Sequence, residues 1–382
     1  MRIIHLALGK ANPNRMNGVN RFVHKLATTQ VNLGYEVELW GITASLEHNY
    51  PKRNYSTQLF PKANNPFRLH PSLKQAINQL DQSTIVHIHG AFIPSLYACA
   101  ILLHRQSIPY VHSSHGAFNP IALKKNRWAK MVYFNLFERY GLKNARIIHV
   151  LGQSIFNHLS HMGRFPQAVL IPMGVDLEEL HPSTKNDASN FNFGFCGRIY
   201  TKVKGLDLLL KGFQLYRNKN GQGKLHLIGD GRDMEEVKQL IQELDITSSV
   251  ILHGAKFGEE KWELFRQLNV FLHPSRNEGF PTAVVEALGM GIPCIVSQAT
   301  NAGAYIADYE AGICLKENEA SCIAAAMHDM EEKWLSGQLL QIRENATHLA
   351  NTEFTWPHIA KQFIHHYSTA IPQLQEVPSS SL

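Results

Sequence analysis

Two glutamates separated by seven residues, Glu278 and Glu286, are the side chains of this sequence best suited to bind a polar ligand. An apolar run over 270–274 precedes them, and a Gly-Ile-Pro turn over 291–293 leads into another apolar run. The predicted order is strand, loop, helix, turn, strand, with Glu278 in the loop and Glu286 well along the helix. The two carboxylates then cannot act as one tight pair, and each would contact a different part of one extended, hydroxyl-rich ligand. The alternative is a solvated loop glutamate and a glutamate on an exposed helix face.

The residues between the two glutamates predict a helix that begins where a phosphate could bind. Pro281 suits the first helical position, where a missing N–H costs nothing and φ is already set. Gly279 lets the backbone bend sharply just before it, and Phe280 and Thr282 flank the proline. Such a helix start presents free N–H groups and the positive end of the helix dipole, which favours a phosphate in front of it.

A segment upstream carries two cations at a comparable position. Residues 193–209 again read as a strand, a glycine turn and a helix. The pattern places Arg198 and Lys204 just beyond the carboxyl end of the strand, where open α/β sheets bind their ligands. Two cations beside a helix terminus would form a clamp for a diphosphate.

Together these two segments resemble the retaining glycosyltransferases of family 4, which have the GT-B fold. The resemblance covers nearly the whole chain, although only the second half carries highly specific motifs. It implies that Arg198 and Lys204 grip the diphosphate of a nucleotide-sugar donor, that Glu278 contacts the sugar and that Glu286 holds the ribose hydroxyls. The residues implied to bind the donor beside Glu286 are Gly279, Phe280, Pro281 and Thr282.

Two positions in the first half also match the family. Gly18 follows the first predicted strand, where the family has a glycine-rich loop close to the donor phosphates and the acceptor; this chain has one glycine where a pair is common. The alternative for Gly18 is an ordinary turn. His115 follows a predicted strand end, precedes a glycine and matches a family position beside the transferred sugar, so the resemblance implies a catalytic role for it. His89 is a weaker candidate, because most of the 21 histidines must be surface or packing residues.

The sequence favours catalysis without a metal or another cofactor. It contains no Asp-x-Asp, the carboxylate pair that usually holds a divalent ion on the donor diphosphate. Arg198, Lys204 and the helix that starts near Pro281 would replace the cation. The histidine pairs at 87/89 and 112/115 have no carboxylate or cysteine at metal-ligand spacing, so a metal site is not predicted.

Two further motifs qualify the resemblance. The turn Gly229-Asp-Gly231 lacks the third glycine of a dinucleotide fingerprint, with Met234 in its place, and therefore predicts an ordinary strand-to-helix turn. The segment 301–306, Asn-Ala-Gly-Ala-Tyr-Ile, stands where the family often has two glycines followed by an acidic residue. That departure concerns the part of the pocket that contacts the sugar.

Length and pattern predict two α/β domains. The chain has 382 residues, 44% hydrophobic and 18% charged, which is typical of a globular protein too long for one core. Apolar runs alternate with helix-like stretches in both halves, which predicts two doubly wound parallel sheets; the resemblance adds that they face a cleft. We expect an acceptor-binding domain over 1–180, a donor-binding domain over 181–355, and a segment 356–382 whose helix crosses back to the first domain before a disordered tail. The polar stretch 182–190 is the predicted linker.

Charge and cysteine content indicate the setting. Residues 1–180 carry a net charge of +11 and the remainder −5, so the first domain would face an anionic partner. Nucleic acid is not predicted, because no nucleic-acid-binding motif is present. The cluster Lys124, Lys125, Arg127, Trp128 and Lys130 favours an anionic membrane surface; the alternative is a core-facing helix with a solvated basic end. Five scattered cysteines, no signal peptide and no apolar run long enough to span a bilayer predict a cytoplasmic protein, peripheral on the membrane if that cluster binds lipid.

The sequence therefore predicts a retaining, metal-independent glycosyltransferase of the hexosyltransferase type. Its partners would be a nucleotide-sugar, with a UDP-sugar preferred over a GDP-sugar, and a glycan or lipid-linked acceptor in surface polysaccharide or glycolipid biosynthesis. Two alternatives stay open at this point: a sugar-nucleotide epimerase of the same fold and a non-catalytic sugar-nucleotide-binding protein. The oligomeric state is not predicted.

Overall fold

The computed structural model describes residues 1–382 without 13–17, 48–51, 125, 178–179, 181–190 and 372–382. The predicted linker, the predicted disordered tail and Lys125 lie outside the described residues. The chain divides into two compact units: unit 1 is Met1–Gly174 with Trp356–Leu382, and unit 2 is Val175–Thr355. All five cysteines lie in described segments and are free.

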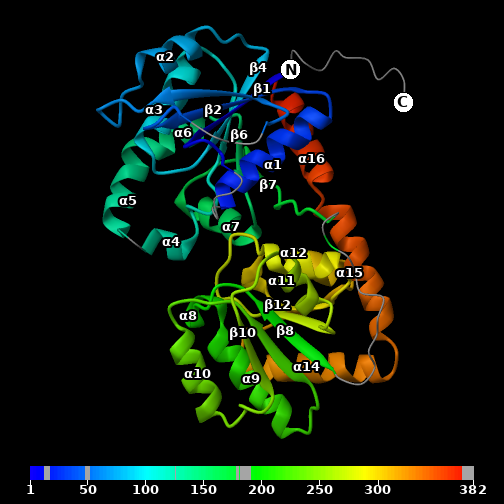
Figure 1. Ribbon diagram of the computed structural model, residues 1–382. Helices are drawn as coiled ribbons and strands as arrows, with labels where there is room; N and C mark the ends of the chain where they lie inside the picture. Colours follow the sequence, from blue (N-terminus) through cyan, green and yellow to red (C-terminus); the bar gives the residue numbers. More distant parts are fainter. Residues whose placement is uncertain (13–17, 48–51, 125, 178–179, 181–190, 372–382) are drawn as a thin grey trace. The chain divides into compact units, whose positions relative to one another are not determined.

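Unit 1 is built on a parallel sheet of seven strands in the order β3-β2-β1-β4-β5-β6-β7 (Figure 1). Its central strands are apolar because helices cover both faces of such a sheet, and every residue of β4 is buried. The order reverses between β1 and β4, which pair in parallel. The strands are β1 (Arg2–Leu8), β2 (Glu36–Thr43), β3 (Ser56–Pro61), β4 (Thr84–His89), β5 (Tyr110–Ser113), β6 (Ile147–Val150) and β7 (Ala168–Leu170).

The helices of unit 1 include the last helix of the chain. That helix, α16, packs against α1: the ring of Phe22 meets those of Trp356 and Phe363 edge-on, with centroids 5.6 and 6.1 Å apart. Tyr367 on the same helix is fully buried. The helices are α1 (Gly18–Asn32), α2 (Pro71–Asn78), α3 (Pro94–Arg105), α4 (Pro120–Lys124), α5 (Arg127–Tyr133), the π-helix η1 (Phe134–Glu138), α6 (Arg139–Asn144), α7 (Gln153–Met162) and α16 (Trp356–Ala370).

Unit 2 repeats the plan with a parallel sheet of six strands in the order β10-β9-β8-β11-β12-β13 (Figure 1). The order reverses between β8 and β11. The strands are β8 (Asn192–Cys196), β9 (Lys224–Ile228), β10 (Val250–Gly254), β11 (Val270–His273), β12 (Cys294–Ser297) and β13 (Gly312–Leu315). The helices are α8 (Thr201–Lys204), α9 (Leu206–Asn218), α10 (Met234–Glu243), α11 (Gly258–Phe265), α12 (Thr282–Gly289), the 3-10 helix η2 (Gln298–Thr300), α13 (Gly303–Asp308), α14 (Ala320–Leu335) and α15 (Leu339–Glu353).

The core of unit 2 is rich in aromatic residues from β8 and α9, including Phe193, Phe213 and Tyr216. Helices α9 and α14 approach closely at Gly212, where an added Cβ would lie 2.8 Å from the side chain of Ile323. The turn at Gly229 and Gly231 is a packing turn as well. A Cβ on Gly229 would lie 1.9 Å from the carbonyl oxygen of Gly197, so the loops after β8 and β9 need glycine to pass each other.

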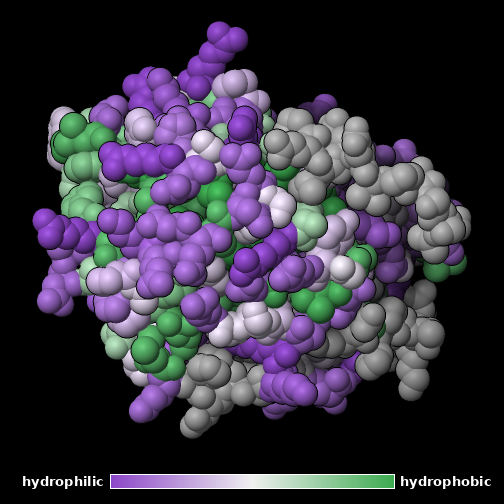
Figure 2. Space-filling model, turned by 90° about the horizontal axis from the view of Figure 1, so that it is seen from above, coloured by the Kyte–Doolittle hydropathy of each residue, from purple (hydrophilic) through white to green (hydrophobic). Residues whose placement is uncertain are grey.

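Two parallel α/β sheets therefore confirm the predicted fold class. Figure 2 shows that hydrophilic residues cover most of one face of the molecule and that the hydrophobic residues on it lie in small groups among them. No helix in the described part of the chain combines the length and the apolar character that a membrane span needs.

Candidate functional site

The predicted site residues of unit 2 lie on the loops and helices that follow β8 and β11, the two strands between which the sheet order reverses. Arg198 and Lys204 follow β8, and Glu278 follows β11. In open α/β sheets the crevice beyond the carboxyl ends of such a strand pair is the usual place for a ligand. The fold thus brings together two loops that are about 70 residues apart in sequence.

Glu278 is the best-connected side chain at this edge. Its Oε1 accepts hydrogen bonds from Nε2 of His273 at 2.8 Å and from Oγ of Ser275 at 3.0 Å, and it forms an ion pair with Lys204. Burial opposes its charge, but the N–H of His273 and the ammonium of Lys204 outweigh burial, so the pKa of Glu278 falls to about 2. Burial lowers the pKa of His273, which is therefore a neutral donor at pH 7. The site holds a fixed, ionised carboxylate.

A tight turn and an arginine hold Lys204 and Glu278 next to each other. Gly205 adopts φ +69°, and an added Cβ would lie 2.0 Å from the carbonyl oxygen of Pro274, so glycine is required where the two loops touch. The backbone N–H of Arg276 donates to the Val203 carbonyl at 2.9 Å. Its guanidinium donates two hydrogen bonds to Asp207, at 2.6 and 2.9 Å. The loop after β11 is thereby fastened to the start of α9.

Asn301 explains the departure from the family pattern in segment 301–306. It lies in the left-handed region at φ 64°, which asparagine tolerates better than most residues. Its Nδ2 donates to the carbonyl oxygens of Glu278 and Gly279 at 3.0 and 2.9 Å. This departure therefore supports the loop that carries Glu278.

The second glutamate has its own cation. Nζ of Lys261, on α11, lies 2.5 Å from Glu286, and both side chains are largely buried. Burial raises the pKa of Cys196 at the end of β8 to about 11, and the charges of Lys261, Glu286 and Lys204 all act on this thiol. Lys204 and the Lys261–Glu286 pair thus both affect the thiol at the end of β8.

Arg198 differs from Lys204 in its surroundings. It is exposed, and its guanidinium lies 5.4 Å from the ring centroid of Tyr200. Arg232 lies over the same ring at 4.7 Å. Within the described residues we find no carboxylate paired with Arg198, so its N–H groups can bind an anion.

The start of α12 differs by one residue from the prediction. Pro281, predicted at the first helical position, is the residue before it: its φ of −85° and ψ of 101° are extended, and Thr282 begins the helix. The Pro281 carbonyl accepts the N–H of Val284, so the proline closes the loop as the helix cap. Among the described residues no side chain caps this helix start, and Phe280 is buried against Phe354, with ring centroids 5.4 Å apart.

In unit 1 the structure places Gly18 at the start of the helix that follows β1, and His115 on the loop after β5. Gly18 is the exposed first residue of α1, and Asn17 before it lies outside the described residues. His115 is partly exposed just beyond β5, with a left-handed φ of 47°. Its Nε2 shares a hydrogen bond of 2.9 Å with Nδ1 of His89. Burial lowers the pKa of His115 to about 3, so the ring is neutral at pH 7.

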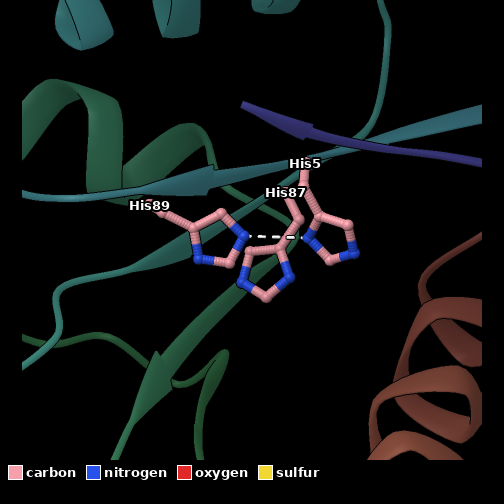
Figure 3. A group of neighbouring side chains, drawn as sticks. All are labelled: His5, His87 and His89. Atoms are coloured by element: carbon pink, nitrogen blue, oxygen red, sulfur yellow. Dashed lines mark hydrogen bonds between the residues drawn. The ribbon is translucent and has the colours of Figure 1, made fainter. Parts of the chain in front are cut away.

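The side chains of His5, His87 and His89 lie together in unit 1 and are the group whose spacing could hold a metal ion among the described residues (Figure 3). Both ring nitrogens of all three already form hydrogen bonds. Burial lowers all three pKa values. A metal would have to break most of these bonds, and no carboxylate belongs to the group, so the hydrogen-bonded arrangement explains these residues better.

Comparison with known proteins identifies the family. The family model of Glycosyltransferase Family 4 matches residues 16–179, and that of Glycosyl transferases group 1 matches residues 176–349. The chain belongs to these glycosyltransferases. The family predicted from the motifs around Arg198 and Glu278 is confirmed.

Relatives and solved structures agree with this assignment. The chain is 27% identical over 248 residues to the "Putative glycosyltransferase EpsF" of Bacillus subtilis, covering 62% of each chain. It is 25% identical over 334 residues to the "GDP-mannose:cellobiosyl-diphosphopolyprenol alpha-mannosyltransferase" of Xanthomonas campestris, covering 84% of this chain and 83% of the relative. The matched part thus spans under two thirds of the length of EpsF and smaller shares of some other relatives.

The solved structure of Anabaena HepE in complex with UDP matches with a TM-score of 0.71 and 18% identity, covering 97% of this chain and all of that one. That similarity confirms the GT-B fold.

Sequence reasoning missed several residues at this site. His273 ends a recognised strand five residues before Glu278, and that short spacing to the glutamate could have marked it. Ser275 and Asn301 carry no motif of their own. Lys261 lies on a separate helix, and nothing in the sequence connects it with Glu286.

Proposed function

We propose that this glycosyltransferase transfers a hexose from a nucleotide-sugar to a glycan or lipid-linked acceptor, with retention of the anomeric configuration. The observation that carries the proposal is the ionised Glu278, fixed by Lys204, His273 and Ser275 at the strand pair where the sheet order reverses. A carboxylate held in this way orients the hydroxyl groups of a sugar, because it can accept hydrogen bonds only.

Charge stabilisation comes from the cations around Glu278. Arg198 with its unpaired guanidinium and Lys204 with its remaining N–H donors would bind the donor diphosphate and stabilise the negative charge that grows on it as the sugar leaves. The uncapped start of α12 at Thr282 adds partial positive charge. We propose that these groups replace a divalent ion, so that the enzyme needs no metal or other cofactor.

Donor binding is assigned to the loop and helix that join the two glutamates. Gly279 and Phe280 belong to the loop, and Pro281 and Thr282 form the helix start. Glu286 accepts hydrogen bonds from the ribose hydroxyl groups, and Lys261 holds the Glu286 carboxylate in place. In unit 1, Gly18 and His115 keep their predicted roles as part of this proposal. We propose a UDP-sugar before a GDP-sugar: the similar HepE structure contains UDP, whereas the Xanthomonas relative is named for GDP-mannose.

The names of the relatives support a role in surface polysaccharide or glycolipid assembly, and they do not favour an epimerase or a non-catalytic binding protein. An epimerase would convert the donor alone, which the experiment below detects. We further propose a cytoplasmic enzyme that attaches peripherally to an anionic membrane through unit 1.

That attachment is supported by an outward-facing apolar stripe along α5, η1 and α6. Trp128, Val132, Leu136 and Tyr140 follow one another at four-residue spacing and are exposed by 76, 57, 63 and 46%. Phe134 and Glu138 on the opposite side are buried, so the helix faces the core with one side only. Lys124 and Arg127 are exposed beside the stripe, as an anionic lipid surface requires.

The test is a screen of UDP- and GDP-sugars for protection of the full-length protein against thermal unfolding, followed by turnover of the protective donor with glycan and polyprenyl-diphosphate-linked acceptors. We expect a raised unfolding temperature with one class of donor, and a product whose anomeric configuration by NMR equals that of the donor. An inverted product, or a new sugar-nucleotide isomer formed without acceptor, would contradict the proposal.

A further inference from the structure

Two rows of hydrogen-bonded side chains run through the buried part of unit 1 behind His115. Both cross the sheet, because neighbouring parallel strands place their histidines side by side; His5 of β1 and His87 of β4 are register partners. Figure 3 shows how the rings of His5, His87 and His89 converge. The outer row is Gln30, His5, His89 and His115, with successive contacts of 2.7, 2.9 and 2.9 Å. The inner row is Tyr367, His87, Ser113, His149 and the carbonyl of Ile171.

Every histidine of the two rows is neutral at pH 7. Burial lowers the pKa of His5 and His149 to about 4 and that of His115 to about 3, and lowers those of His87 and His89 as well. A neutral imidazole has one N–H donor and one acceptor nitrogen. If one nitrogen of a ring donates, the other nitrogen of that ring must accept, which in turn fixes the role of the neighbouring residue. Once the donor is known at one end of a row, the donor and acceptor of every other hydrogen bond in the row are known.

The inner row has such an end. Nε2 of His149 lies 2.9 Å from the carbonyl oxygen of Ile171, which can only accept, so this nitrogen carries the proton. Nδ1 of His149 must then accept from the hydroxyl of Ser113 at 2.7 Å. Ser113 in turn accepts from Nε2 of His87, and Nδ1 of His87 accepts from the hydroxyl of Tyr367 at 2.5 Å. The hydroxyl proton of Tyr367 is therefore used in the hydrogen bond to Nδ1 of His87.

The hydrogen bond from Tyr367 to His87 determines how the side-chain amide of Gln30 is oriented. The Tyr367 oxygen has only lone pairs left for a further neighbour, so a neighbour must approach it as a donor. Burial raises the pKa of Tyr367, and the Gln30 side chain acts on it as such a donor and lowers it again in part. The approach is not a full hydrogen bond, because Nε2 of Gln30 reaches no partner within hydrogen-bond geometry. Oε1 of Gln30 lies 2.7 Å from Nε2 of His5, so the NH2 group is the end of the amide left for Tyr367.

The outer row then has one direction. Oε1 of Gln30 only accepts, so Nε2 of His5 donates to it and Nδ1 of His5 accepts from Nε2 of His89. Nδ1 of His89 is left to accept from Nε2 of His115. We infer that Gln30, His5 and His89 are positioning residues that hold His115 in the tautomer protonated on Nε2, so that its Nδ1 presents a lone pair to a hydroxyl group of the bound sugar or acceptor.

The position of His115 fits this role. It lies just beyond the carboxyl end of β5 and is partly exposed, and its Nδ1 has no hydrogen-bond partner among the residues that the structure describes. The identity of the hydroxyl rests on the proposed function, whereas the tautomer does not. Nδ1 of the neutral His115 ring accepts the hydrogen bond of the ligand hydroxyl and so orients the hydroxyl oxygen. The proton on Nε2 stays on the ring.

The first test needs no substrate. Nitrogen-15 NMR of the full-length protein with labelled histidine distinguishes protonated from unprotonated ring nitrogens, and His115 is assigned through the spectrum of His115→Ala. We expect Nε2 of His115 to be protonated and Nδ1 unprotonated at pH 7. In Gln30→Met, which keeps the side-chain length but removes the acceptor, the two tautomers should mix. A protonated Nδ1 in the wild type, or an unchanged tautomer in Gln30→Met, would overturn the inference.

The second test asks whether Gln30 affects turnover through the tautomer of His115. Gln30→Met should lower kcat about tenfold with a donor KM within about twofold of the wild type, as expected for loss of a group that orients another. In the His115→Ala background the same change should have no further effect, because its only route is gone. Additive losses would show a general packing role and contradict the inference.

A matched control removes a buried histidine contact elsewhere. His226 and His253 form a 3.0 Å hydrogen bond in unit 2, and His226→Gln should leave the His115 resonances unchanged. If Gln30→Met shifts the tautomer while no nucleotide-sugar is turned over by the wild type, the assignment of the row stands and the proposed function fails. The two outcomes are therefore separate.

Discussion

At the scale of single residues, the cations of the site in unit 2 differ in whether a carboxylate already pairs with them. Lys204 shares its charge with Glu278, whereas the guanidinium of Arg198 contacts the face of Tyr200 and is open to an anion. Lys202, on the same short helix as Lys204, forms an ion pair with Asp207 at 3.4 Å and has 77% of its side chain exposed. The three cations are close in sequence, but only Arg198 and Lys204 are assigned to the diphosphate.

Arg198→Ala and Lys204→Ala should each lower kcat by about 100-fold or more, because charge on the leaving phosphate is largest in the transition state. Donor affinity, measured by calorimetry, should fall less than the rate. Lys202→Ala is the matched control and should stay within about twofold of the wild type. Near-normal rates in both Arg198→Ala and Lys204→Ala would remove the proposed clamp.

The pKa of Glu278 predicts a pH-dependent contribution to stability. Its pKa is about 2 in the folded protein against an ordinary value of 4.5, so its stabilising effect is complete above pH 4.5 and is lost as the pH falls toward 2. Glu278→Gln should therefore reduce the free energy of unfolding by urea more at pH 7 than at pH 3. The exposed Glu263→Gln serves as the control. An equal reduction at both pH values for Glu278→Gln would contradict the assignment of its pKa.

At the scale of elements, the loop after β11 is positioned by its attachment to α8 and α9. Arg276→Ala removes two hydrogen bonds to a largely buried Asp207 and should lower the free energy of unfolding by about 1–3 kcal/mol. It should also lower kcat, because Lys204 and Glu278 lose their common support. Lys238→Ala breaks an exposed pair with Glu235 and should cost under about 0.5 kcal/mol. Similar losses in both variants would show that Arg276 is an ordinary surface residue.

The apolar stripe of α5, η1 and α6 should bind membranes. The wild type should co-sediment with anionic vesicles at low salt and be released at high salt, since each cation contributes about 1 kcal/mol near anionic lipid. Trp128→Gln with Val132→Gln should abolish binding, and Lys124→Gln with Arg127→Gln should weaken it. Lys130 is left out, because its Nζ donates to the Ala122 carbonyl at 2.5 Å.

The control for this experiment is Leu335→Gln, which removes an exposed leucine of α14 in unit 2. It should leave vesicle binding unchanged. Donor-induced thermal shifts should be the same in all variants. Equal binding of the wild type to neutral and anionic vesicles would exclude the proposed attachment.

Sequence patterns predicted these elements better than they predicted their contacts. The positions of Arg198 and Glu278 beyond strand ends were predicted correctly because each follows a strand within a recognisable motif. Pro281 was displaced by one residue, since its φ suits either the first helical position or the one before it, and only the observed ψ decides. Lys261 and His5 could not be predicted: their partnerships depend on strand order and register, which bring residues 25 and 84 positions apart into contact.

At the scale of the whole molecule, the family and the two parallel α/β sheets could be predicted from the sequence because motifs indicate the family and periodicity indicates the sheets.

The proposed enzyme works without a metal ion, because protein cations balance the charge that develops over the complete reaction. Turnover should persist in excess EDTA, measured with a donor identified in the thermal screen and with protein dialysed against chelator. Loss of activity that magnesium or manganese restores would contradict the assignment of Arg198 and Lys204.

Helix α16 has a consequence for biosynthesis. Its residues Phe363 and Tyr367 are part of the interior of unit 1, yet they are among the last that a ribosome would add to the described chain. N-terminal domains commonly fold first during synthesis, but here α1 keeps an uncovered apolar face and the inner histidine row lacks its tyrosine until the entire second unit has been translated. Unit 1 is therefore completed only after unit 2 has been synthesised.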